Sequence, residues 1–139
     1  DIVLKNCKGK VLDAGCGNAN NAIAIAPLTK KVYAIDVSRE MLKFARKNIR
    51  AAGLTKKISL KHASVLDLPF KNGFFGVCAY FAVLHHFRKK SEREKAFSEI
   101  NRVLKKGGFA LITVWNKHKG KQFVPFTKKT GEKILPILP

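Results

Sequence analysis

Five short apolar segments rich in β-branched residues recur along the chain, and segments with helical periodicity lie between them. They predict five strands, with the sequences KVLDAG, KVYAID, KISLKHA, FFGVCAYF and GFALITVW. Strands that alternate with helices form a parallel sheet through right-handed crossovers, so this order predicts an α/β fold, a doubly wound, mainly parallel sheet with helices on both faces. Ligands of such sheets bind beyond the carboxyl ends of the strands. We therefore expect a site built from residues just after Gly15, Asp36, Ala63 and Tyr80.

The segments between the strands carry helix start and stop signals. A short helix is expected in NANNAIAIA, where the following proline ends it. The next helix begins after Ser38 as its N-cap and ends at Gly53. In the third, SEREKAFSEINRVLKKGG, Ser91 and Glu94 have the spacing of a capping box, and KKG closes the carboxyl end of the helix.

The 139 residues suffice for one domain with a buried core, and we expect residues 1–139 to form a single domain. The chain begins at Asp1 without a leading Met and stops at LPILP, which predicts a fragment or a processed chain. No apolar run approaches the ~20 residues of a membrane helix. The three cysteines lie far apart without a zinc spacing, so we expect a cytoplasmic protein in a reducing setting, with no metal site.

The charge balance is strongly basic. The chain carries 28 Lys and Arg against 9 Asp and Glu, a formal net charge of +19. A field of that sign concentrates polyanions around a protein and speeds their encounter with it, so the charge predicts a nucleic-acid partner. A lysine-rich genome that produces a solvated basic surface is the alternative.

The segment VLDAGCGNAN, at 11–20, leads from a strand into a glycine turn and a helix. Gly15 and Gly17 let the backbone approach a ligand closely, but Ala19 leaves a three-glycine pattern incomplete. Asp13 would repel the pyrophosphate of a dinucleotide and would favour a ligand with an ammonium group and a sulfonium. S-adenosylmethionine is such a ligand. The alternative is that Asp13 only caps nearby backbone amides.

Asp36 ends the second predicted strand, 19 residues after Gly17. This is the usual place for an acid that accepts hydrogen bonds from both ribose hydroxyls. Binders of NAD and of S-adenosylmethionine share such an acid, so Asp36 predicts a ribose contact without separating the two. Asp13 disfavours an NAD-dependent reductase. The alternative role for Asp36 is an exposed acid that caps the next helix.

Five segments in this order, VLDAGCGNAN, AIDVSREMLKFAR, LDLPF, FAVLHHF and INRVLKKGGFALITVW, resemble the class I S-adenosylmethionine-dependent methyltransferases and cover nearly all of 9–116. More narrowly, AVLHHF, Arg93, GGFALITVW and the later FVPF are similar to the tRNA wobble-uridine carboxymethyl methyltransferases. The resemblance implies the Rossmann-like class I methyltransferase fold. That fold usually adds an antiparallel strand pair after the fifth strand, and the basic tail either supplies this pair weakly or lacks it.

The resemblance also implies which residues bind S-adenosylmethionine. They are Asp13, Gly15, Cys16, Gly17, Asp36, Val37, Ser64, Val65 and Leu84. The glycine loop would hold the methionine end, the strand-end acid the ribose, and the segment that begins at Ser64 the adenine edge. Leu84 and His85 would lie over the methyl group. The chain departs from the family at Ser64, where an Asp is frequent, at Gly76 and at Ala19.

The acceptor side is expected between the fourth strand and the helix that follows it. The candidate catalytic residues there are His85, His86 and Arg88. A histidine can orient an acceptor or take a proton, and the alternative is that one of the pair packs structurally while the other faces the site. A carboxymethyl carboxylate has a pKa near ~4 and is ionised at neutral pH, so its methylation requires no general base.

Basic residues on two predicted helices are the candidates for RNA contacts. They are Arg39, Lys43, Lys89, Lys90 and Arg93. With the tail KHKGKQFVPFTKK, which interleaves Lys with Phe, they would provide a cationic and aromatic path for RNA. A solvated helix surface is the alternative for each of them. Trp115 is expected to pack at the end of the fifth strand.

These patterns together predict an enzyme that uses S-adenosylmethionine to methylate RNA, with a carboxymethyl group on a tRNA wobble uridine as the favoured acceptor. A methyltransferase for a small metabolite and a non-catalytic RNA-binding protein with the same fold are the alternatives. The resemblance implies one further partner, a small zinc-binding activator subunit. No association with a membrane is expected.

Overall fold

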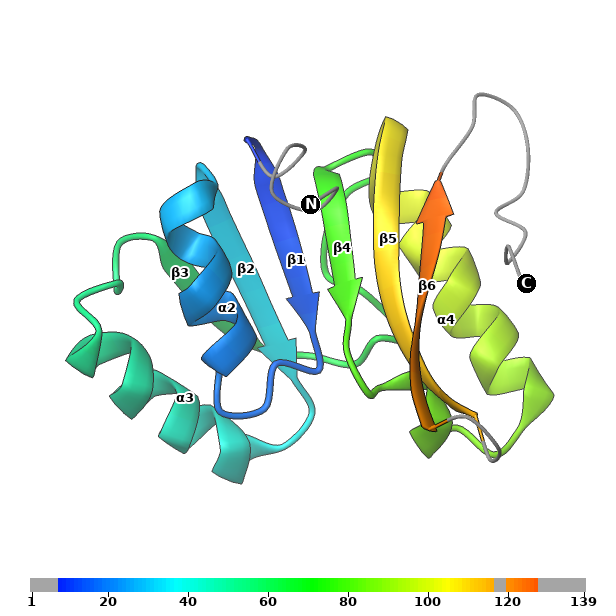
Figure 1. Cartoon of the computed structure of the whole chain (residues 1–139), viewed down its shortest axis with the longest axis horizontal. Coiled ribbons are helices and arrows are strands. Elements are labelled where there is room, and N and C mark those ends of the chain that lie inside the picture. Colours follow the sequence, from blue (N-terminus) through cyan, green and yellow to red (C-terminus); the bar gives the residue numbers. More distant parts are fainter. Residues whose placement is uncertain (1–7, 117–119, 128–139) are drawn as a thin grey trace.

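The computed structural model describes residues 8–116 and 120–127, and describes the side chains of residues 8–113. A six-stranded sheet in the order β3-β2-β1-β4-β5-β6 forms its centre (Figure 1). The strands are β1 (Lys10–Ala14), β2 (Lys31–Asp36), β3 (Ile58–His62), β4 (Phe75–Tyr80), β5 (Leu104–Asn116) and β6 (Gly120–Thr127). The first five pair in parallel, which confirms the doubly wound sheet predicted from the sequence.

Helices cover both faces of this sheet. They are α2 (Asn20–Ile25), which continues into the short η1 (Ala26–Leu28), α3 (Arg39–Ala51), the 3-10 turn η2 (Leu84–His86) and α4 (Lys90–Val103). The apolar residues of α2 and α3 pack in one buried cluster, and those of α4 pack in another on the opposite face (Figure 1). Within 8–116 and 120–127, no helix combines the length and the apolar character needed to cross a bilayer.

Alternating side chains of the central strands supply these two clusters. In β2, Val32 and Ala34 join the cluster of α2 and α3, whereas Ile35 joins the cluster of α4. Successive side chains of a strand point to opposite faces, so a strand that is buried on both faces is apolar at nearly every position. This arrangement leaves the ends of the strands as the places where polar residues can gather.

The helix signals are confirmed for α3 and only partly for α4. Ser38 caps α3, since its hydroxyl accepts from the Met41 amide at 3.2 Å, and Gly53 follows the helix with φ 69°. The capping box predicted from Ser91 and Glu94 is wrong. The helix already begins at Lys90 with Lys89 as its N-cap, so Ser91 lies inside the first turn.

The segment KKGG does not close α4 but forms an irregular start of β5. The pairing of β4 with β5 runs from Phe75 opposite Leu104 to Val77 opposite Phe109, so the intervening residues of β5 bulge. A Cβ atom on Gly108 would lie 2.9 Å from the Gly76 carbonyl oxygen, so this glycine permits a close backbone approach. The strand therefore starts directly where the helix ends.

A sixth strand extends the sheet beyond the five predicted. β6 pairs antiparallel with β5, from Phe109 opposite Thr127 to Asn116 opposite Gly120. The basic tail thus supplies one antiparallel strand of the expected pair within the described residues. Its Pro125 lies in an outermost strand, the position in a sheet that tolerates a residue without an amide hydrogen.

Candidate cofactor and acceptor site

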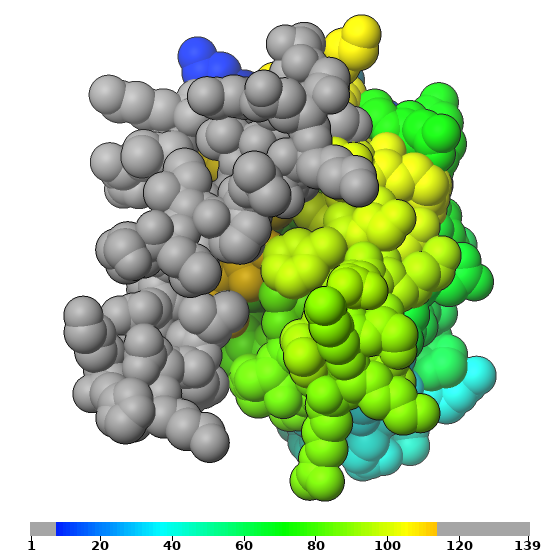
Figure 2. All heavy atoms as spheres, turned by 90° about the vertical axis from the view of Figure 1, so that its right-hand side faces the viewer, coloured from blue at the N-terminus to red at the C-terminus, as the bar shows by residue number. Residues whose placement is uncertain are grey.

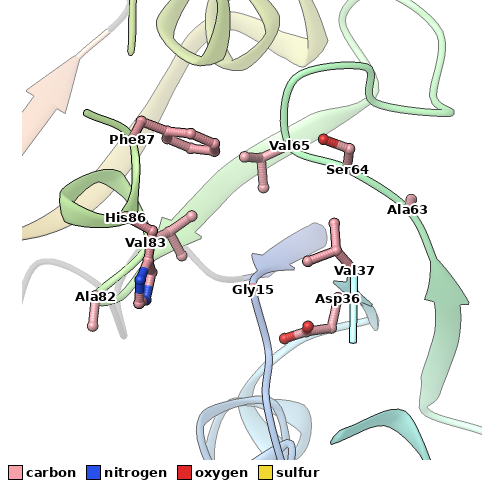
Figure 3. A pocket seen from close by; sticks show the side chains of 10 residues that line it. All are labelled: Gly15, Asp36, Val37, Ala63, Ser64, Val65, Ala82, Val83, His86 and Phe87. Atoms are coloured by element: carbon pink, nitrogen blue, oxygen red, sulfur yellow. The ribbon is translucent and has the colours of Figure 1, made fainter. Parts of the chain in front are cut away.

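A cavity opens at the carboxyl ends of four parallel strands, β1 to β4 (Figure 3). Its volume of about 340 Å³ lies within the range of ~300–1,000 Å³ that is typical of small-molecule sites. The lining residues follow β1, β2, β3 and β4 and are Gly15, Asp36, Val37, Ala63, Ser64, Val65, Ala82, Val83, His86 and Phe87. The cavity therefore lies where the strand order predicts a ligand site, after Gly15, Asp36, Ala63 and Tyr80.

The turn after β1 brings the backbone close to the opposite wall. A Cβ atom on Gly15 would lie 2.5 Å from Cγ2 of Val83, and the φ of Gly15 is 70°. Only glycine satisfies both conditions. Gly17, at φ 53°, donates from its amide to Oδ2 of Asp36 at 2.8 Å, so the turn is tied to the end of β2.

Ala19 adopts the conformation that a glycine would favour. Its φ is 69°, and its side chain is fully buried. The left-handed conformation costs an L-residue about 1 kcal/mol. The loop therefore keeps the backbone path of the three-glycine pattern without the third glycine. Cys16, the remaining residue predicted in this turn, is buried among apolar side chains rather than in the lining of the cavity, and burial raises the pKa of its thiol to about 12.

Asp13 lies buried beneath this turn, with 1% of its surface exposed. One carboxylate oxygen accepts from the Ala22 amide, so Asp13 does cap a nearby backbone group. The other oxygen, Oδ2, has no hydrogen-bond partner within the described residues. Burial raises the pKa of Asp13 to about 7, and the nearby Asp36 carboxylate adds to the increase. A cationic group brought close to this oxygen would favour the ionised carboxylate.

Asp36 and Val37 form the wall at the end of β2. The two carboxylate oxygens of Asp36 accept from the amides of Gly17 and Ser38, each at 2.8 Å, which fixes the orientation of the side chain. Each carboxylate oxygen can accept a further hydrogen bond, so capping does not prevent a ligand contact. Val37 is 65% exposed at the cavity, so its side chain is accessible to a ligand there.

The segment after β3 forms the facing wall. The Ser64 hydroxyl accepts from the Leu66 amide at 3.1 Å and keeps its own hydrogen to donate. The Ser64 carbonyl accepts from the Asp67 amide at 3.2 Å, so a tight turn holds this residue. Val65 is buried and contributes its side chain to the same wall (Figure 3).

The loop after β4 supplies the fourth wall. Ala82 has φ 56°, and its amide donates to Oγ1 of Thr113 at 2.7 Å. The Val83 side chain lies close to Gly15, and the ring of Phe87 points across the cavity toward Val65 (Figure 3). Leu84, the residue expected over a methyl group, is instead buried in the core cluster of α4, because the 3-10 turn directs it inward.

The two histidines of this loop lie in different surroundings. His86 lines the cavity, whereas His85 does not, and their ring centroids are 4.2 Å apart. Partial burial and the neighbouring His86 lower the pKa of His85. Both side chains are exposed, so neither packs in the core. The structure therefore brings one of the two predicted catalytic histidines into the site.

The basic residues predicted to contact RNA do not line the cavity, and neither does Arg88, which was predicted to be catalytic. Arg88, Lys89 and Lys90 are exposed at the start of α4, a segment that projects from one edge of the molecule in Figure 2. Arg93 is different, since its Nη1 donates to the carbonyls of Phe87 and Arg88 at 2.8 and 2.9 Å and closes the loop. On the other side, a shallow groove between α3 and β3 is lined by Arg39, Leu42, Lys43, Arg46, Leu60, Lys61 and His62.

Four lining residues were not predicted from the sequence, namely Ala63, Ala82, Val83 and Phe87. Three of them belong to the quoted motif FAVLHHF, so the signal was the motif rather than any single side chain. Small and apolar residues after a strand end give no chemical signal of their own. Within the described residues, no three His, Cys, Asp or Glu side chains gather as a metal site would require.

Comparisons with known proteins agree with this geometry. A family described as methyltransferase domain matches residues 12–112. A tRNA (carboxymethyluridine(34)-5-O)-methyltransferase from Arabidopsis thaliana is 35% identical over 76% of this chain and 24% of its own length. A ubiquinone/menaquinone biosynthesis C-methyltransferase from Wigglesworthia glossinidia brevipalpis is also 35% identical, over 78% of this chain and 43% of its own.

A solved structure has the same fold. The crystal structure of the YcgJ protein from Bacillus subtilis superposes with a TM-score of 0.73 and 26% identity, over 81% of this chain and 48% of that one. The chain thus spans about half or less of the length of these relatives. Members of the matched family use S-adenosylmethionine as their methyl donor. The chain belongs to the class I S-adenosylmethionine-dependent methyltransferases.

Proposed function

We propose that this protein transfers a methyl group from S-adenosylmethionine to RNA, and that the acceptor is a carboxymethyl group on a tRNA wobble uridine. The observation that carries the proposal is a cavity with the polar groups of a nucleoside site, flanked by basic residues at the start of α4 and along α3. The cofactor half of the proposal follows from the walls of the cavity. The acceptor half follows from the surface around it.

The lining residues fit the adenosine part of S-adenosylmethionine. Asp36 would accept hydrogen bonds from the ribose hydroxyls, and Val37 and Val65 would cover the faces of the adenine. The Val65 amide donates to no acceptor within the described residues, so it can meet a ring nitrogen of adenine. Asp13 does not line the cavity, but its buried Oδ2, unpartnered within the described residues, would favour a cofactor that carries an ammonium group and no phosphate.

When bound, the cofactor supplies a methyl group on a sulfonium, which is already a good leaving group. The protein then has to align the acceptor within about 3 Å of that methyl and to exclude water. His86 is the polar lining residue contributed by the loop after β4, and Phe87 beside it closes the cavity toward Val65. His86 is suited to orienting a carboxylate acceptor, which needs no general base because it is ionised at neutral pH.

The surface charge supports a polyanionic substrate. The chain carries a net charge of +19, and two ion pairs on α3 and α4, Lys43–Glu40 at 3.5 Å and Lys90–Glu94 at 3.7 Å, are exposed. Exposed pairs of this kind contribute little to stability, so the cations stay available to phosphates. We assign Arg39, Lys43, Lys89 and Lys90 to the RNA surface and Arg93 to the loop that supports it.

A small apolar acceptor is the second candidate function. It is favoured by one observation, the 35% identity to a C-methyltransferase of ubiquinone and menaquinone biosynthesis, which equals the identity to the tRNA enzyme. A non-catalytic RNA-binding protein is disfavoured because Asp36 and its two amide contacts are in place. A small zinc-binding activator subunit stays a prediction.

The direct test is mass spectrometry of tRNA nucleosides from cells with and without this gene. The proposal predicts that the methyl ester of the wobble carboxymethyluridine disappears and that its free acid accumulates in the deleted strain. An unchanged nucleoside profile would refute the tRNA substrate. In vitro, RNA binding should weaken steeply as salt rises, whereas binding of a small neutral metabolite should not respond to salt.

A further inference from the structure

The adenine wall belongs to a long connection between β3 and β4 that contains neither a helix nor a strand of the sheet. Ser64 and Val65 line the cavity, while the same connection continues through Leu68 and Phe70 to Asn72 before β4 begins. A segment of this kind has few backbone hydrogen bonds of its own. Its position therefore depends on contacts with other elements.

One set of contacts is aromatic. Phe70 and Phe74 pack with Tyr33 and Phe75 of the sheet, with ring centroids between 4.9 and 5.9 Å apart. Lys10 places its ammonium 4.1 Å from the centre of the Phe74 ring. These rings hold the far end of the connection against the sheet. Nearer the cavity, Val65 and Leu68 are buried in the core cluster of α4, and the Ala63 amide donates to the Asp36 carbonyl at 3.1 Å.

Two charged residues of α4 bind the backbone in the middle of the connection, at Leu68 and Phe70. The carboxylate of Glu99, a residue 5% exposed, accepts from the Leu68 amide at 2.7 Å. Arg102 donates from Nη2 to the Leu68 carbonyl at 2.9 Å and from Nη1 to the Phe70 carbonyl at 2.6 Å. The Leu68 peptide groups are thus held at both ends, three residues from the wall of the cavity.

Glu99 and Arg102 also hold each other. Arg102 contacts both carboxylate oxygens of Glu99, at 2.8 Å each, in the two-pronged geometry that gives an arginine a fixed direction. A further donor of the same guanidinium reaches Oδ1 of Asn72 at 3.1 Å. Glu99 is buried and Arg102 is partly exposed, and such a pair is weak evidence for added stability, because removing charges from water offsets much of their attraction. Its geometry is better suited to fixing a segment in place.

We propose that Glu99 and Arg102 are positioning residues for the cofactor: they hold the β3–β4 connection so that Ser64 and Val65 form the adenine wall. This inference rests on the proposed placement of S-adenosylmethionine in the cavity. Neither residue lines the cavity, so both act through the connection. Two conservative variants loosen the anchor. Arg102→Lys keeps the charge but lacks the planar fork, and Glu99→Gln keeps the shape but loses the charge.

The test measures binding of two ligands to the full chain by calorimetry, S-adenosylhomocysteine and its analogue with hypoxanthine in place of adenine. The wild type should prefer adenine. Both variants should bind S-adenosylhomocysteine about tenfold more weakly, whereas their affinity for the hypoxanthine analogue should change little. The reason is that a displaced Ser64–Val65 segment no longer forms hydrogen bonds specific to the edge of adenine. Amides of 66–70 should exchange faster with solvent.

Glu94→Gln is the matched control, since it neutralises the same type of residue on the same helix in an exposed ion pair with Lys90. It should leave both affinities unchanged. Folded variants that keep the wild-type preference for adenine would overturn the inference, and so would an equal loss for both ligands that follows the loss of thermal stability. A wild type that binds neither ligand would refute the proposed function, and the inference with it.

Discussion

The two halves of the cavity are built differently. On the cofactor half, Asp36 is fixed by two backbone amides and the turn at Gly15 has a conformation that only glycine tolerates without strain. On the acceptor half, His86 and Arg88 are exposed on a 3-10 turn and the residues after it. The proposed cofactor half thus depends on partly buried groups that backbone contacts fix, whereas the proposed acceptor half depends on exposed side chains.

The halves meet where Val83 lies over Gly15, so we expect the largest effect there. Gly15→Ala would place a methyl group 2.5 Å from Cγ2 of Val83 and should weaken binding of S-adenosylhomocysteine at least about a hundredfold. Calorimetry measures this loss. Gly53→Ala is the matched control, with φ 69° and no atom within 4 Å of the added carbon. Val83→Ala in the Gly15→Ala background should recover part of the affinity. Equal effects of the two alanine substitutions would contradict a contact between the halves.

A change confined to the cofactor half should be the next largest. Asp36→Asn replaces an acceptor by an amide nitrogen that faces the backbone amides of Gly17 or Ser38. The lost charge-assisted contacts should weaken binding of S-adenosylhomocysteine between about tenfold and a hundredfold. Fluorescence or calorimetric titration gives the affinity. Glu40→Gln removes the same charge from an exposed pair and should have no effect. An unaffected Asp36→Asn variant would remove the ribose contact from the account.

A change confined to the acceptor half should spare the cofactor. His86→Ala should lower kcat about tenfold through lost orientation of the acceptor, and should leave the affinity for S-adenosylhomocysteine unchanged. His85→Ala, one residue away and outside the cavity lining, is the control. Its kcat should stay within about twofold of the wild-type value. Steady-state kinetics with the tRNA substrate separates the two. If His85→Ala has the larger effect, the assignment of the pair is reversed.

The smallest effect concerns pH and the cofactor half. The folded pKa of Asp13, about 7, lies above its ordinary value of 3.8, so the folded chain binds more protons than the unfolded chain between these values. Its contribution to stability is present at low pH and is lost as pH rises through 7. The free energy of unfolding should therefore fall by about 1 kcal/mol between pH 6 and pH 7 relative to Asp13→Asn. Denaturant titrations of both proteins at both pH values measure this fall. An equal change in the free energy of unfolding for the two proteins would contradict a raised pKa of Asp13.

The parallel sheet and the position of the cavity could be predicted from the sequence, for identifiable reasons. The strands and the turn at Gly15 depend on local backbone geometry, and the residue types in these segments directly favour that geometry. Ala19 is an exception, because it adopts the left-handed conformation that alanine disfavours. Tertiary contacts there outweigh local preference.

The elements that sequence analysis missed depend on contacts between distant segments. KKGG reads as a helix end, but it forms a bulge because β5 must pair with β4 across Gly76. The sequence left open whether the basic tail supplies an antiparallel strand, and the structure forms β6 there through pairing with β5. Likewise, the sequence predicts that Arg93 contacts RNA phosphate. Only the structure shows that its guanidinium donates to the carbonyls of Phe87 and Arg88.

The central claim is that the cavity at the carboxyl ends of β1 to β4 holds the adenosine of S-adenosylmethionine. The most direct measurement is a calorimetric titration of the full chain with S-adenosylhomocysteine, repeated with Asp36→Asn. We expect saturable binding at one site per chain, weakened by the Asp36→Asn substitution. A folded wild-type chain that shows no saturable binding, or binds equally well after Asp36→Asn, would contradict it.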